Sequence, residues 1–207
     1  MKLYWSDVLS PRKVCAVAKY LQSPVEYVYL DLGRGEHKTA EYLALNPNGQ
    51  VPTLVDGART LWESAAIMCH LAARCDSALW PQDARQFDVL RWLSWDLARV
   101  YPCAGELYFQ YVIRPRFRLG DADPAEVQRA TDAWRRCAAI LDNHLRGRRW
   151  LVGDSITVAD FALGITLPYA ERARIPLDEF PAVKRWHERL NELDAWREPF
   201  PAVAEAA

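Results

Sequence analysis

The sequence lacks the features that would place it in a membrane or on nucleic acid. No stretch approaches the roughly 18 consecutive apolar residues of a spanning helix, and 26 Lys and Arg balance 27 Asp and Glu at a net charge of −1. Proteins that bind nucleic acid carry a basic excess that is absent here. The first residues reach Asp7 before an apolar run of signal-peptide length develops. We therefore expect a cytoplasmic protein without a membrane or nucleic-acid partner.

Cysteine occurs in a pattern that fits neither a metal site nor a disulfide framework. The count is odd, the spacing is wide, and both the C-x-x-C motif and Cys/His clusters at zinc spacing are missing. The five residues are Cys15, Cys69, Cys75, Cys103 and Cys137. We expect reduced, mostly buried thiols and no bound metal.

Apolar residues are plentiful, and they follow two different patterns along the chain. Of 207 residues, 51% are hydrophobic and nine are Trp, which supports a sizeable core. This length suits one large domain or two small ones. Strand-like segments occur before residues 76–84, and long helical periodicities follow them. The pattern predicts two parts.

The first part alternates strands and helices. Ser10 is a good helix cap and Pro11 suits a first helical position, so we expect a helix to begin there and to end before Ser23-Pro24. The run 25–30 is typical of a strand buried on both faces and parallel to the first strand. Asp56-Gly57 predicts a tight hairpin. The expected elements are strands at 2–5, 25–30, 53–55 and 59–62, and helices at 10–22, 39–45 and 64–74.

The second part reads as entirely helical. Asp123-Pro124 opens a helix with apolar residues at spacings of three and four, and Gly147 follows its end. The expected helices cover 83–112, 124–145, 157–167 and 182–194. Thr157 and Asp160 have the spacing of a capping box, in which each side chain satisfies a free backbone donor. We therefore expect the capping box to stabilise the helix and to have no catalytic role.

The pair Val51-Pro52, directly before an expected strand, is the first candidate for chemistry. A cis peptide bond at Pro52 would turn the main-chain polar groups of Val51 outward, where an extended peptide could pair with them. The alternative is a trans proline that ends a loop.

The surrounding motif carries a family resemblance that covers nearly the whole chain. The run Leu43-x-x-Asn46-Pro47-Asn48-Gly49-Gln50-Val51-Pro52-Thr53-Leu54-Val55 is followed by Leu61-x-Glu63-Ser64-x-Ala66-Ile67 and, later, by Gly153-Asp154-x-x-Thr157-x-Ala159-Asp160. Together they resemble the glutathione S-transferases, of a serine-type, bacterial-like kind. The resemblance implies a thioredoxin-like α/β glutathione-binding domain at 1–76, a linker at 77–84, and an all-α domain at 85–207 that binds the second substrate.

The resemblance also implies where glutathione binds. Val51, beside a cis Pro52, would pair with the cysteinyl part. Glu63 and Ser64 would hold the γ-glutamyl group, because a carboxylate suits its ammonium and a helix N-terminus suits its carboxylate; Ser64 could also be a plain N-cap. The implied contacts to the glycyl carboxylate are His37, Lys38 and Gln50.

Ser10 is the expected catalytic residue. It follows the first strand and precedes a helix, so its hydroxyl and the helix N-terminus could both face the glutathione sulfur. The turn is one residue shorter than the commoner form in the family, which leaves Ser6 and Tyr4 as competitors. Arg12 could add positive potential, although we expect solvent around it. Cys15 would lie on the second helical turn and is expected to serve packing.

The resemblance implies a cytoplasmic, homodimeric detoxification enzyme with glutathione as a co-substrate and no cofactor. The second substrate would be a small apolar electrophile, held by aromatic residues of the helical part that line a cleft between the domains. These residues are Trp95, Tyr101 and Tyr108. Two alternatives remain open: a glutathione-dependent disulfide reductase or dehalogenase, and a non-catalytic binding or regulatory protein.

Overall fold

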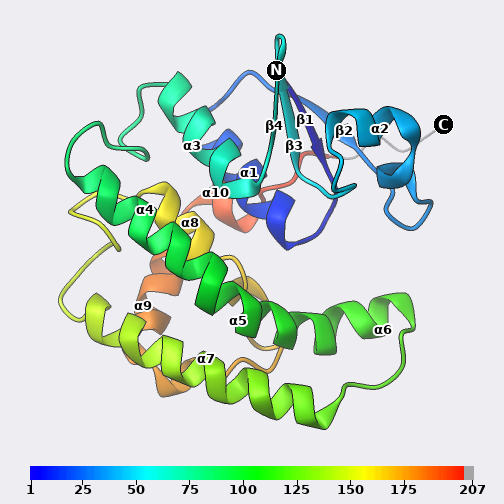
Figure 1. Ribbon diagram of the computed structural model, residues 1–207. Coiled ribbons are helices and arrows are strands. Elements are labelled where there is room, and N and C mark those ends of the chain that lie inside the picture. Colours follow the sequence, from blue (N-terminus) through cyan, green and yellow to red (C-terminus); the bar gives the residue numbers. More distant parts are fainter. Residues whose placement is uncertain (203–207) are drawn as a thin grey trace. The chain divides into compact units, whose positions relative to one another are not determined.

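The computed structural model describes residues 1–202 and divides the chain into two compact units (Figure 1). Residues 1–80 and 193–202 form the first unit, and residues 81–192 form the second. Residues 193–202 thus belong with the first unit, although the sequence placed all of 85–207 in the second part; residues 203–207 lie outside the described residues. Across 1–202, none of the helices combines the length and apolar character that a membrane crossing requires.

A four-stranded mixed sheet forms the centre of the first unit. Its strands are β1 (Lys2–Trp5), β2 (Glu26–Tyr29), β3 (Thr53–Asp56) and β4 (Arg59–Trp62), in the order β2-β1-β3-β4. Strand β2 is parallel to β1, as predicted, and β3 is antiparallel to both β1 and β4. The hairpin is confirmed, with Asp56 opposite Arg59 and Gly57 at a φ of 59°.

The expectation that β2 is buried on both faces was wrong. Glu26 and Tyr29 are exposed, and the two residues between them are half-buried. The reason is topological, because β2 stands at the edge of the sheet and, among the strands of residues 1–202, pairs with β1 alone. Apolar and β-branched residues here reflect β-propensity rather than double-sided burial.

Helices α1 (Leu9–Tyr20) and α3 (Ser64–Arg74) pack together on one side of the sheet, and α2 (Ala40–Leu45) lies on the other (Figure 1). The predicted N-cap of α1, Ser10, was two residues late. Val8 is the N-cap, and both Ser10 and Pro11 lie in the first turn, where the first main-chain bond runs from Arg12 N to Val8 O at 3.1 Å. Pro11 fits there because the first amide groups of a helix have no intrahelical acceptor.

The C-terminal helix α10 (Asp194–Arg197) packs against α1. Arg12, expected in solvent, is only 7% exposed: its Nη2 donates to Trp196 O at 2.6 Å, and its guanidinium lies over the Trp196 ring. Phe200 stacks on Trp5 with ring centroids 5.0 Å apart. These contacts explain why the C-terminal residues belong to the first unit.

The second unit opens with a long helical stretch that contains two π-helical turns. Helices α4 (Arg85–Trp95), α5 (Tyr101–Tyr108) and α6 (Arg114–Phe117) are joined by π turns at Asp96–Val100 and Phe109–Ile113. Each π turn ends two residues before a proline, Pro102 or Pro115. Proline lacks the amide hydrogen and clashes with a preceding carbonyl group, and a widened turn relieves both problems.

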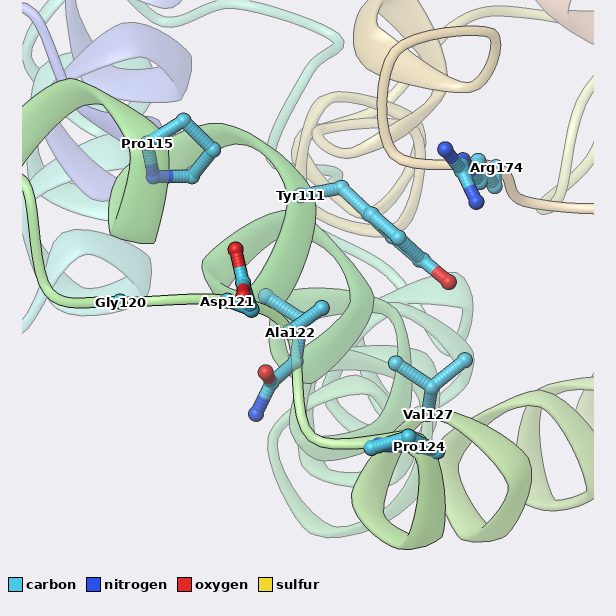
Figure 2. A pocket seen from close by; sticks show the side chains of 9 residues that line it. Tyr111, Pro115, Gly120, Asp121, Ala122, Pro124, Val127 and Arg174 are labelled. Carbon is cyan, nitrogen blue, oxygen red and sulfur yellow. The ribbon is translucent and has the colours of Figure 1, made fainter.

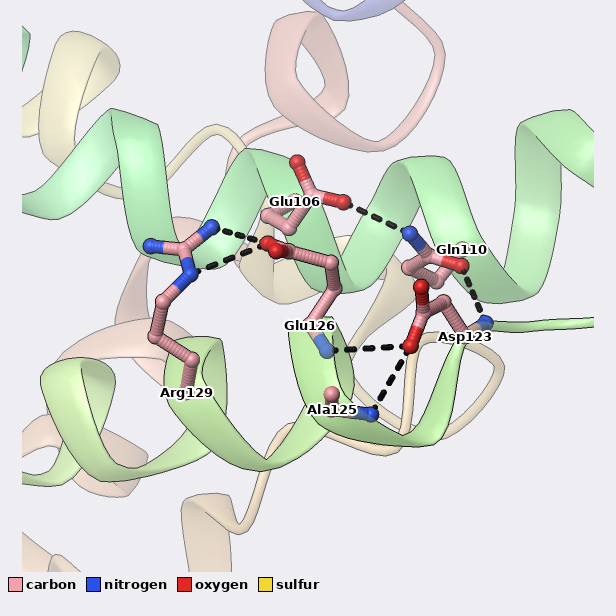
Figure 3. Close-up of polar contacts among 6 residues, drawn as sticks. All are labelled: Glu106, Gln110, Asp123, Ala125, Glu126 and Arg129. Atoms are coloured by element: carbon pink, nitrogen blue, oxygen red, sulfur yellow. Dashed lines mark hydrogen bonds and ion pairs between the residues drawn. The ribbon is translucent and has the colours of Figure 1, made fainter.

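The loop between α6 and α7 (Pro124–Leu145) is pinned by a polar network (Figure 3). Asp123 caps α7 as predicted, with Oδ1 accepting from Ala125 N at 2.9 Å. The buried amide of Gln110 donates to Glu106 Oε1 at 2.7 Å and accepts from Asp123 N at 2.9 Å. Both ends of this side chain are therefore satisfied, which holds the loop against α5 and the turn that follows it.

Helices α8 (Val158–Leu163) and α9 (Pro181–Leu190) complete the second unit. The predicted capping box of Thr157 and Asp160 is present, and α8 ends at Leu163 rather than at 167. Asp160 also accepts from Leu151 N and from Trp186 Nε1, both at 3.0 Å. Burial raises the pKa of Asp160 to about 6, and these donors oppose that rise. The expected fold class, a thioredoxin-like domain followed by helices, is confirmed.

Candidate functional site

A small pocket, lined almost entirely by polar surface, lies within the first unit. Three segments contribute to it: the first turn of α1, the loop before β3, and the start of α3. The lining residues are Ser10, Asn46, Asn48, Gln50, Val51, Pro52, Glu63 and Ser64. The structure thus brings together six of the residues singled out in the sequence and adds two asparagines.

The loop before β3 is held in shape by hydrogen bonds to its own main chain. The Val51-Pro52 peptide bond is cis, as predicted. Gln50 O accepts from Tyr42 Oη at 2.6 Å and from Asn46 Nδ2 at 2.8 Å. Asn46 Oδ1 accepts from Asn48 N at 3.1 Å, which closes a turn. Val51 precedes β3 and takes no part in its strand pairing, so the loop offers a fixed main-chain edge beside the pocket.

Lys38 reaches this loop from the 3₁₀ turn Glu36–Lys38. Its Nζ donates to Gly49 O at 2.9 Å, which places the cation next to Gln50. Gly49 has a φ of 57°, which favours glycine, and a Cβ there would lie 3.0 Å from the main-chain His37 O. Neither Lys38 nor His37 is among the pocket-lining residues. Burial, and secondly the Lys38 charge, lower the pKa of His37.

The start of α3 contributes Glu63 and Ser64. Glu63 is the N-cap, with φ 70° and ψ 113° and without a capping hydrogen bond from its own side chain, as judged over residues 1–202. Such a φ is unfavourable for a residue with a side chain, and strained residues of this kind cluster at functional sites. Ser64 is 7% exposed and is the first helical residue, so it is not the N-cap.

The candidates for the catalytic hydroxyl occupy different environments. Ser10 lines the pocket, whereas Ser6 is 2% exposed and Tyr4 packs its ring on Tyr42 with centroids 5.7 Å apart. Cys15 is fully buried, and burial raises its pKa to about 12. Within the described chain, Ser10 alone of these four belongs to the pocket lining.

Two features of the first unit were not predicted from the sequence. Asn46 and Asn48 had no assigned role in the sequence beyond the family motif, although both residues line the pocket; the Asn-Pro-Asn-Gly run was the available signal. His70 received no role from the sequence, and the structure shows its Nε2 paired with Asp56 Oδ2 at 2.9 Å, which joins α3 to β3. It is absent from the lining of the pocket described above.

The aromatic residues predicted to bind the second substrate have different neighbours in the second unit. Trp95 packs edge-on against Trp92, and Tyr108, 5% exposed, packs edge-on against Tyr169. These edge-on contacts hold both rings in place, and Trp95 is half-buried, so part of its surface stays accessible.

A cavity of about 520 Å³ lies elsewhere in this unit, beside the loop pinned by Gln110 (Figure 2). Arg174 lies over the Tyr111 ring, 4.4 Å from its centroid, on one wall. This size and mixed lining are typical of small-molecule sites.

Comparison with known proteins places both units in one family. Residues 3–73 match the glutathione S-transferase N-terminal domain and residues 100–194 match the C-terminal domain. Glutathione S-transferase 3 from Zea mays is 34% identical over 98% of this chain and 94% of its own length. A disulfide-bond oxidoreductase, YfcG, from Escherichia coli (strain K12) is 26% identical, over 93% and 91%.

A solved structure agrees with these matches. The glutathione transferase URE2P6 from Phanerochaete chrysosporium, in complex with oxidized glutathione, superposes with a TM-score of 0.83. It is 29% identical, and the alignment covers 96% of this chain and 93% of that one. With a match to both domain models, this chain belongs to the glutathione S-transferase family.

Proposed function

We propose that this enzyme is a glutathione transferase that binds glutathione in the pocket of the first unit and activates its thiolate for attack on a small apolar electrophile. The observation that carries the proposal is the pocket itself, where Ser10, Val51 and Ser64 meet. The names of the Zea mays relative and of the glutathione complex support the choice of glutathione. We assign this role to residues 1–76, with a linker at 77–84 and the second substrate bound by residues 85–207.

The cysteinyl part would pair with the main chain of Val51, which is free of the strand ladder. The γ-glutamyl carboxylate would accept from the amide groups that open α3, where the first intrahelical bond is Ile67 N to Glu63 O. The Glu63 carboxylate would bind the ammonium. Lys38, beside Gln50, would attract the glycyl carboxylate together with His37.

Ser10 would donate to the glutathione sulfur, which makes the protein a serine-type member of the family. A free thiol has a pKa of about 8.5, and lowering it by two units requires about 2.7 kcal/mol of preferential anion stabilisation. The Ser10 hydroxyl and the N-terminus of α1 together supply interactions of that size.

Trp95, Tyr101 and Tyr108 of the second unit would hold the electrophile. We further propose a homodimer and a cytoplasmic detoxification role. Analytical ultracentrifugation tests the dimer, because a monomer of 23.7 kDa at micromolar concentration would contradict it.

A second candidate activity is glutathione-dependent disulfide reduction, which the name of the Escherichia coli relative favours. The two activities share the glutathione site and differ in the second substrate. Turnover with a nitrochlorobenzene, hydroxyethyl disulfide and a halogenated alkane ranks transferase, reductase and dehalogenase. Calorimetric titration with millimolar glutathione tests all three, because a lack of binding would indicate a non-catalytic member of the family.

A further inference from the structure

Two cysteines of the second unit, on different helices, lie side by side. Cys103 is on α5 and Cys137 is on α7. Both lie at Val100, because Cys103 Sγ is 3.2 Å from Val100 O and Cys137 lines a small cavity together with Val100. The two helices pack together, and buried Ala104 and Ala138 follow the two cysteines in the sequence. Small residues at a helix contact allow close approach, and both cysteines at this contact are free thiols.

Cys103 is the buried member of the pair. It is 3% exposed, and its Sγ lies 3.2 Å from the carbonyl oxygens of both Arg99 and Val100. These carbonyl groups belong to the π turn Asp96–Val100, and π turns are frequent at functional sites. The hydrogen bond to Cys137, and secondly burial, raise the pKa of Cys103, which therefore keeps its proton.

Cys137 is the accessible member. It is half-buried, and the charged groups acting on it are Arg136 and Arg99. The hydrogen bond from Cys103, followed by these cations, lowers the pKa of Cys137 to about 7 against the opposing effect of burial. Burial instead raises the pKa of Cys69 to about 12. A partly exposed thiolate in an electropositive setting is the kind that reacts with oxidants.

We propose that Cys137 and Cys103 form a reversible disulfide when the protein meets a hydroperoxide, with Cys137 as the attacking thiolate and Cys103 as the resolving thiol. The Cys137 sulfur attacks one peroxide oxygen, an S–O bond forms, the O–O bond breaks, and the leaving oxygen takes a proton and departs as water or alcohol. The Cys103 sulfur then attacks the Cys137 sulfenic acid; an S–S bond forms, the S–O bond breaks, and the Cys103 proton leaves with the hydroxyl as water. The two sulfurs lose two electrons, and the peroxide gains them.

The test uses the full chain carrying Cys75→Ser, which removes the exposed cysteine and leaves four thiols from five. After treatment with hydrogen peroxide, thiol titration in denaturant should fall from four to two, and dithiothreitol should restore four. Peptide mapping should find Cys103 linked to Cys137. Four remaining thiols, or a disulfide between another pair, would overturn the proposal.

Single substitutions in this background separate the two roles. Cys137→Ser should keep all three of its thiols after peroxide, whereas Cys103→Ser should accumulate a Cys137 sulfenic acid that dimedone traps. Cys69→Ser is the matched control and should lose two thiols, as the parent does. Circular dichroism checks folding, and Cys137→Ser, at the half-buried position, disturbs packing least. Loss of thiols in Cys137→Ser would show that Cys137 is not the attacking residue.

The rate of alkylation by iodoacetamide gives an independent readout. Its dependence on pH should show a midpoint near 7 for Cys137, and Cys103→Ala should move that midpoint upward because the hydrogen-bond donor is lost. Arg136→Gln should move it upward by less. A midpoint at the ordinary thiol value in the parent would contradict the assignment of Cys137 as the thiolate.

Discussion

The two helices that begin at the pocket, α1 and α3, start differently from helices α8 and α9 of the second unit. In the second unit, buried carboxylates satisfy the first amide groups of α8 and α9: Asp160 closes the capping box, and Asp142 Oδ1 accepts from Ala182 N at 2.7 Å. In the first unit, as described over residues 1–202, the N-cap residues Val8 and Glu63 contribute no capping side chain to α1 or α3. Both of these helices begin at the pocket.

The amide groups at a helix start can serve either the stability of the fold or the binding of a ligand. A side-chain cap stabilises a helix by about 1 kcal/mol, so two uncapped helix starts are a cost to the fold. The same amide groups can accept an anionic ligand instead. We infer that α1 and α3 keep these donors for glutathione, whereas α8 and α9 use theirs for contacts that stabilise the second unit.

The largest expected effect comes from Asp160→Ala. The substitution leaves Leu151 N, Thr157 N and Trp186 Nε1 buried without this acceptor, and each unsatisfied group costs about 1–3 kcal/mol. The free energy of unfolding in urea should fall by more than about 3 kcal/mol. Asp154→Ala, at an exposed acid nearby, is the control and should change it little. Equal effects of the two substitutions on the free energy of unfolding would show that Asp160 does not have this structural role.

The pH dependence of stability tests the same residue. Burial raises the pKa of Asp160 to about 6, above the ordinary value near 3.9, so the folded state holds this proton more tightly than the unfolded state. Its contribution is full below about pH 4 and is lost as the pH rises through about 6. Urea unfolding across this range should show a decline of up to about 3 kcal/mol that is absent in Asp160→Asn. The same decline in Asp160→Asn would assign it to another group.

Glu63→Ala and Ser64→Ala should act on ligand rather than on fold. Each removes a charge-assisted partner worth about 1.5–3 kcal/mol, so the Kd for glutathione should rise by about 10- to 150-fold. Calorimetric titration measures the change. Glu26→Ala, at an exposed acid of β2, is the matched control. Unchanged affinity in both pocket variants would place the γ-glutamyl group elsewhere.

The smallest expected effect, that of Glu63→Gly, tests the difference between the uncapped start of α3 and the capped start of α8 most sharply. Glycine adopts the φ of 70° found at Glu63 without steric cost, so Glu63→Gly should raise the free energy of unfolding by about 1 kcal/mol while weakening glutathione binding. Thr157→Gly, at the capping box, should lower stability. A loss of stability in both variants would mean that Glu63 stabilises α3 rather than the site.

Local signals in the sequence predicted much of this fold. Asp56-Gly57 located the hairpin, Asp123-Pro124 located the start of α7, and the spacing of Thr157 and Asp160 predicted their box. In each case the residues that determine the structure are neighbours in the chain. The start of α1 was misplaced because a proline is tolerated anywhere in the first turn.

Contacts between segments that are distant in the sequence could not be predicted from such local signals. Arg12 lies 184 residues from Trp196, and no periodicity reports that pairing. The same holds for Cys103 and Cys137, which both lie at Val100, and for Asn46, which supports Gln50 and also lines the pocket. The motif resemblance predicted which residues gather around Val51. It did not predict that Asn46 and Asn48 line the pocket, which only the structure shows.

Ultraviolet titration of the thiolate of bound glutathione tests most directly whether the uncapped end of α1 activates the sulfur through Ser10. Ser10→Ala should raise the apparent pKa of bound glutathione by about one to two units, roughly the loss of one charge-assisted hydrogen bond, with little change in affinity. Ser6→Ala and Tyr4→Phe should leave that pKa where it is in the parent. An unchanged pKa in Ser10→Ala together with a rise in either of the other two variants would contradict the assignment of Ser10.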